Sequence, residues 1–146
     1  MRTPASIAGH PVHPMLVPIP IGLWIFSFVC DLIHAAGGTT TWETVALFTM
    51  GGGVIGALAA AVVGFIDMLS LPPGPKKTAL VHMTINLVVV ALFVLNFFLR
   101  LHAEMPDAGK LIWLSIIAIA LLVISGWLGG KLVYEHGIGV DTKALN

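Results

Sequence analysis

Four long apolar segments, separated by short polar stretches, dominate the pattern of this sequence. They run over about residues 15–33, 45–66, 80–99 and 111–130. Each is close to the roughly 20 apolar residues that an α-helix needs to cross a bilayer. The pattern therefore predicts an all-α integral membrane four-helix bundle, with the lipid bilayer as its surroundings.

Two polar stretches flank the predicted four-span membrane domain, which covers residues 15–136. Residues 1–14 form a polar N-terminal arm that carries a His-Pro-x-His-Pro motif, and residues 137–146 form a short C-terminal tail. An even number of spans places both termini on the same side of the membrane. Lys and Arg favour that side, with Arg2, Lys76, Lys77, Lys131 and Lys143 against Arg100 and Lys110 on the other. The positive-inside rule then predicts a multi-pass inner (plasma) membrane protein with cytoplasmic N- and C-termini.

The amino-acid composition supports a membrane protein and argues against a nucleic-acid-binding or disulfide-rich protein. The chain is 58% hydrophobic and 10% charged, with a mean hydropathy of +1.00, whereas globular chains average about 25% charged residues. Its net charge is zero and its seven basic residues form no patch, so nucleic acid is not an expected partner. The single cysteine, Cys30, lies in an apolar run and offers no disulfide framework.

The motif His10-Pro11-Val12-His13-Pro14 leads directly into the first apolar segment. Proline disfavours helix at the residue before it, so we expect both histidines to lie in a stiff, non-helical lead-in. In such an extended chain, residues three apart are separated by about 9 Å. The motif should therefore deliver His13 to the helix mouth and leave His10 further out.

Polar residues from the other segments should reach the same depth as His13. Asp67 ends the second segment, His82 begins the third with Asn86 one turn later on the same face, and His136 follows the fourth. The second segment also presents a face of small residues, Gly53, Gly56, Ala60 and Gly64, which lets neighbouring helices approach closely. Because polar groups are expensive at membrane depth, they usually pair or serve a function.

Three chemistries fit this cluster. Histidines from different helices are the usual axial ligands of haem b, with His13 and His82 as the pair and His136 and Asn86 as further cofactor-binding residues. His10, His13, Asp67 and His82 are alternatively ligands of the types that Zn²⁺, Cu²⁺ or Fe²⁺ accept. A third hypothesis is that the cluster forms a proton relay or a quinone-binding site, since imidazole titrates near neutral pH.

Weak internal repetition accompanies the cluster. His13 and His82 are 69 residues apart, while His34 and His102, and also Asp67 and Glu135, are 68 apart. This spacing is compatible with two tandem helical hairpins in the same orientation, related by an axis along the membrane normal.

The opening stretch from Gly9 to Leu23 resembles the signature of a bacterial family of four-helix membrane proteins, catalogued as domain of unknown function 2231. Ala59 to Asp67, His82 with Asn86, and Gly129 to Gly137 are similar to later parts of that family. The resemblance implies the four-span membrane fold and points to five residues: His10, His13, Asp67, His82 and His136. The family has no established activity, although some members are joined to iron–sulfur or cytochrome-type modules. Many members carry Phe where this chain has Pro18 or Pro20, so we expect the first helix to start differently here.

Two functional hypotheses follow from the sequence. The first is a small redox, haem-binding or metal-binding membrane subunit, which would work with a redox partner. The second is a non-catalytic structural or assembly partner in a larger membrane complex or a homo-oligomer, with the His/Asp/Asn cluster as an interhelical hydrogen-bond network. The chain shows no nucleophile–base pattern, so an independent enzyme is not expected.

Overall fold

The computed structural model describes residues 3–102 and 108–140. Its helices are α1 (Val12–Leu16), α2 (Pro18–Ala35), α3 (Thr40–Leu69), α4 (Pro73–His102) and α5 (Ala108–Tyr134). Two short antiparallel strands, β1 (Ser6–Ile7) and β2 (His10–Pro11), precede them. Within the described residues there is no other strand, so the fold is all-α apart from this small ribbon.

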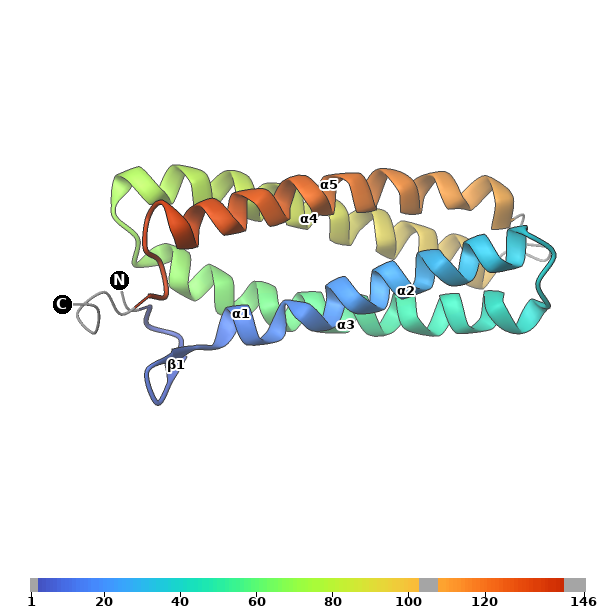
Figure 1. Ribbon diagram of the computed structural model, residues 1–146, viewed down its shortest axis with the longest axis horizontal. Helices are drawn as coiled ribbons and strands as arrows, with labels where there is room; N and C mark the ends of the chain where they lie inside the picture. The colour runs from blue at the N-terminus through green and yellow to red at the C-terminus, as the bar shows by residue number, and fades with distance from the viewer. Residues whose placement is uncertain (1–2, 103–107, 141–146) are drawn as a thin grey trace.

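The helices form two antiparallel hairpins that lie side by side (Figure 1). One hairpin consists of α1 and α2 with α3, and the other of α4 with α5. Four helical stretches are long and apolar enough to cross a membrane: Val12–Ala35, Thr40–Leu69, Pro73–His102 and Leu111–Tyr134. This confirms the predicted four-helix membrane architecture, and the start of α1 and the end of α5 lie at the same end of the bundle (Figure 1).

The helices α3, α4 and α5 are longer than the apolar segments that suggested them. The helix α4, for example, begins at Pro73 rather than near residue 80. Proline is well placed in a first helical turn, where its missing N–H has no partner in any case. A 30-residue helix is about 45 Å long, which covers the headgroup regions as well as the hydrocarbon core, so its polar ends remain helical.

The expectation that both motif histidines precede the helix is wrong for His13. Ala8 and Gly9 have positive φ angles of 51° and 82° and turn the chain between β1 and β2. The helix α1 then begins at Val12 and contains His13. The interruption comes later, at Val17, because Pro18 and Pro20 cannot donate backbone hydrogen bonds to the preceding turn.

The core lies between the two hairpins. The Trp24 and Phe93 rings stack with their centroids 4.4 Å apart and their planes at 12°. Around them pack Met50, Val89, Ala118 and Leu122. Large apolar side chains such as Phe48 and Ile55, both more than 70% exposed, cover the outside of the bundle, where they would contact lipid tails.

Three contacts across the hairpin interface join residues exactly 69 positions apart: His13 with His82, Trp24 with Phe93, and Asp31 with Arg100. Successive members are 11 and 7 residues apart, close to whole numbers of helical turns, so they share one helix face. In a two-fold interface, residues near the axis contact their own equivalents. These contacts therefore support the interpretation of two tandem hairpins. His34 and His102 do not follow it: among the described residues, His34 contacts Thr39 and Glu43, and His102 contacts Phe98.

Candidate functional site

Each of two histidines is held by a carbonyl of the neighbouring helix in its own hairpin. Nδ1 of His13 lies 2.8 Å from the Ala60 carbonyl of α3, and Nδ1 of His82 lies 2.9 Å from the Ser125 carbonyl of α5. Because a carbonyl only accepts hydrogen bonds, Nδ1 must carry the proton in both rings. Nε2 is therefore the ring atom that carries the lone pair in both histidines, and in His82 this lone pair faces the Asn86 amide at 3.2 Å.

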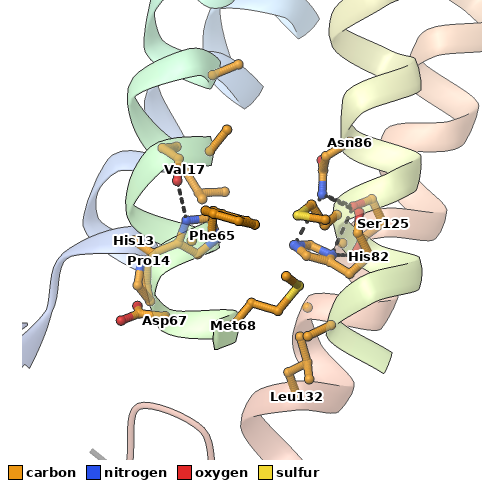
Figure 2. Close-up of a pocket in the computed structure, with 18 of the residues that line it drawn as sticks. His13, Pro14, Val17, Phe65, Asp67, Met68, His82, Asn86, Ser125 and Leu132 are labelled. Atoms are coloured by element: carbon orange, nitrogen blue, oxygen red, sulfur yellow. Dashed lines mark hydrogen bonds between the residues drawn. The ribbon is translucent and has the colours of Figure 1, made fainter. Parts of the chain in front are cut away.

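The two imidazoles face each other between the hairpins (Figure 2). Their ring centroids are 6.4 Å apart and their planes are at 87°. A metal–imidazole bond is about 2.0 Å long and the ring centre lies about 1.2 Å beyond the bonded nitrogen, so two imidazoles on opposite sides of one metal ion have centres roughly 6.4 Å apart. The separation of His13 and His82 matches that arrangement.

The rings lie in an apolar cavity of about 200 Å³, which we name the histidine cavity. All four helices of the bundle contribute to its wall, including Trp24, Ala57, Gly64, Met68, Met83, Val90, Leu122 and Gly129. Glycine is needed at position 64, and position 129 leaves little room for a larger residue. A Cβ on Gly64 would lie 2.8 Å from the His13 ring, and one on Gly129 would lie 3.3 Å from the His82 ring.

Two polar residues, Asn86 and Ser125, lie beside His82 and have no counterpart beside His13. Nδ2 of Asn86 donates to the Ser125 hydroxyl (2.6 Å) and to the His82 carbonyl (2.9 Å), and it lies 3.2 Å from His82 Nε2. The residue 69 positions before Asn86 is the apolar Val17. The two halves of the site are thus alike in their histidines and different in the polar groups beside them.

Asp67 closes the end of the cavity nearest the termini. Its buried carboxylate accepts a 2.9 Å hydrogen bond from the Ala5 backbone N–H. Thr3, Pro11, Ile138 and Gly139 line the same end. Asp67 therefore fastens the N-terminal arm over the cavity.

The remaining candidate residues lie apart from the histidine pair. His10 is exposed in β2, where its Nδ1 donates to the Ala8 carbonyl at 3.1 Å. His136 is outside the cavity wall, and its buried Nε2 has no hydrogen-bond partner among residues 3–102 and 108–140. In the part of the chain that the structure describes, no three His, Cys, Asp or Glu residues are grouped as a metal site. The structure thus gathers His13, His82 and Asn86, with Asp67 at the cavity end.

The family comparison concerns the fold as a whole. Residues 9–142 match the family described as "Predicted membrane protein (DUF2231)". The chain belongs to this family. No curated protein and no solved structure matched. DUF2231 membership supports the membrane fold over nearly the whole chain, and its description names no reaction.

A second buried polar cluster, at the opposite end of this DUF2231 chain, was missed from the sequence. Arg100 makes a bidentate ion pair with Asp31 (2.5 and 2.8 Å), and its Nε donates to Asn96, whose amide donates to Ser115. The 69-residue spacing of Asp31 and Arg100, two opposite charges near helix ends, was the signal that could have revealed it. Every group in this cluster has a partner, so it acts as a clamp between the hairpins.

Proposed function

We propose that this DUF2231 protein is a small haem b-binding membrane subunit, with His13 and His82 as the two axial ligands. One observation carries the proposal: two imidazoles from different hairpins, each anchored through Nδ1, face each other at the separation of a bis-histidine site. Haem held by two histidines is common within helical bundles.

A macrocycle fits this site better than a bare ion. Protein sites for transition metals usually supply three or more ligands, whereas the described residues bring only two histidines together. A porphyrin supplies the other four ligands itself. The apolar wall suits a flat, hydrophobic ring, and the glycines at positions 64 and 129 leave room for the two imidazoles.

The residues around the pair would tune such a group. The carbonyls of Ala60 and Ser125 fix the orientation of the imidazoles and raise their basicity as ligands. Asn86 positions His82, and Asp67 holds the arm that shields the site from water. Haem, when bound, supplies one-electron redox chemistry. Because a one-electron carrier must exchange its electron with another group, we propose that the protein works with a redox partner or within a larger membrane complex.

The positive-inside rule favours a site near the cytoplasmic face of the inner membrane. His13 belongs to α1 and His82 to the first half of α4, so the pair lies towards the end of the bundle at which α1 begins (Figure 1). We therefore assign both termini, and the closed end of the cavity, to the cytoplasmic side.

The test is haem content after expression with adequate haem supply. We expect wild-type protein to purify with one haem per chain, and we expect His13→Ala and His82→Ala to lose it. His10→Ala and His34→Ala are matched controls that should keep it, because neither ring lines the cavity. Wild-type protein without haem, or alanine variants that keep a wild-type absorption spectrum, would contradict the proposal.

One observation favours a structural role as the second candidate. His82, Asn86 and Ser125 already satisfy one another by hydrogen bonds. If the cluster is only an interhelical network in an assembly subunit, His13→Ala and His82→Ala will lower stability without changing any bound species. The haem measurement separates the two candidates directly.

A further inference from the structure

The aqueous end of the histidine cavity is covered. Thr3 and Leu71 are buried there, and the Asp67 carboxylate binds the Ala5 N–H. On the other side of this end, a Cβ added to Gly139 would lie 3.3 Å from the Pro11 ring. The N-terminal arm and the segment after α5 thus meet across the cavity end and cover it.

The side of the cavity between α1 and α5 is different. Pro14 and Gly126 line the cavity and are also exposed on the outside of the bundle. A Cβ placed on Gly126 would meet no atom within 4 Å. Figure 1 shows α1 and α2 diverging from α5 towards the end that carries the termini. Both residues belong to candidate membrane spans, so this opening faces lipid.

The opposite side, between α3 and α4, is more filled. Phe65 and Leu87 line the cavity there, and both are about half exposed. Figure 2 shows the Phe65 ring beside His13 in the gap between α3 and α4. Bulky side chains therefore cover this side, whereas a proline and a glycine border the other.

We propose that the histidine cavity takes its ligand from the bilayer, through the opening between Pro14 of α1 and Gly126 of α5. The ligand class is a lipid-soluble molecule with a flat, metal-bearing ring, of which haem is the example. This inference rests on the proposed haem site, to which it adds the route of access. Ligands that dissolve only in water are excluded by the covered end.

The experiment measures haem uptake from phospholipid vesicles that contain dissolved haem and the reconstituted, haem-free protein. Gly126→Leu should slow uptake at least tenfold, because its side chain fills the opening. Gly22→Leu is the matched control, since Gly22 is an exposed helix glycine with open space around it that does not line the cavity. Equal uptake rates for Gly126→Leu and wild type would overturn the proposal.

Cysteine labelling provides a second measurement, and its comparison of two maleimides can be made on the haem-free protein. The native Cys30 is fully buried, so Gly126→Cys offers a readily accessible thiol. A lipid-soluble maleimide should label it and a charged, water-soluble maleimide should not; haem should protect Gly126→Cys but not Gly22→Cys. Labelling by the charged reagent would overturn the lipid-facing route. Absence of haem uptake by wild type would instead contradict the proposed function and the ligand class.

Discussion

The His13 ring can lie against the backbone of α3 because residue 64 is glycine. Its Nδ1 reaches the Ala60 carbonyl only at this close approach. The sequence was sufficient to predict that His13, His82 and Asn86 share one layer, because each lies at a helix mouth at the same end of the bundle. It could not identify the carbonyls of Ala60 and Ser125, since these partners depend on the register between helices. The hydrogen bond from the Ala5 N–H to Asp67 likewise could not be predicted, because it depends on how the N-terminal arm folds back on α3.

We expect Gly64→Ala to displace the His13 ring, because the added Cβ would lie 2.8 Å from it. Loss of an orienting partner typically weakens metal-ligand sites by about 10–100-fold, and we expect haem affinity to fall by that order. Titration with haem and the absorption spectrum check this. Gly129→Ala is the control with a milder effect, since its Cβ would lie 3.3 Å from His82. Wild-type affinity in Gly64→Ala would show that the anchored position of His13 is not required.

At the level of the helices, one small residue determines how α2 packs on α3. Trp24 lies over Gly53, and its indole N–H donates to the Met50 carbonyl at 3.3 Å. The stacking on Phe93 leaves the indole no room to move. The small-residue face of α3 was evident in the sequence, but which large side chain fills it was not. The break at Val17 was also beyond sequence reasoning, because proline allows either a late helix start or an interrupted helix.

Gly53→Ala should therefore destabilise the bundle, since its Cβ would lie 2.4 Å from Trp24 Nε1. Overpacking of a filled core costs about 1–3 kcal/mol. Thermal unfolding of the detergent-solubilised protein measures the effect. Gly22→Ala, with no atom within 4 Å of the added Cβ, should be neutral or slightly stabilising. An unchanged Tm for Gly53→Ala would disprove the tight contact.

The ion pair between α2 and α4 gives a second prediction at this scale. Asp31→Asn leaves the buried Arg100 without its charged partner, and breaking a buried pair costs about 3–5 kcal/mol. The exchanged pair, Asp31→Arg with Arg100→Asp, should recover a large part of the lost Tm, because the two positions are equivalent in the two hairpins. Glu43→Gln, which removes the partially exposed pair with His34, should change stability by less than about 1 kcal/mol. A double variant no more stable than Asp31→Asn would contradict the equivalence.

For the whole molecule, hydropathy alone was enough to predict four spans and termini at one end. Hydropathy could not predict the first and last residue of each helix, because the helices continue through polar residues that lie in the headgroup region. The internal two-fold relation was visible only as a spacing of 68 or 69 residues. The contacts of Trp24 with Phe93 and of Asp31 with Arg100 give that spacing a physical meaning. Repeats that face each other place one histidine from each half at the same depth.

The orientation of the whole bundle is tested by reporter fusions. A fluorescent protein fused to the C-terminus should fluoresce, because we place that end in the cytoplasm, and a phosphatase that is active only outside the cytoplasm should be inactive there. The same phosphatase inserted between α2 and α3 should be active. The reversed pattern would contradict the assigned orientation while leaving the histidine site untouched.

The electron paramagnetic resonance spectrum of the oxidised, haem-containing protein tests the central claim most directly. The signal depends on the axial ligands of the iron and on the angle between their planes. With His13 and His82 as ligands at 87°, we expect a low-spin ferric signal with the large g-anisotropy of perpendicular imidazoles, lost in His13→Ala and His82→Ala. A high-spin ferric signal in wild-type protein, or no haem iron at all, would contradict a bis-histidine site.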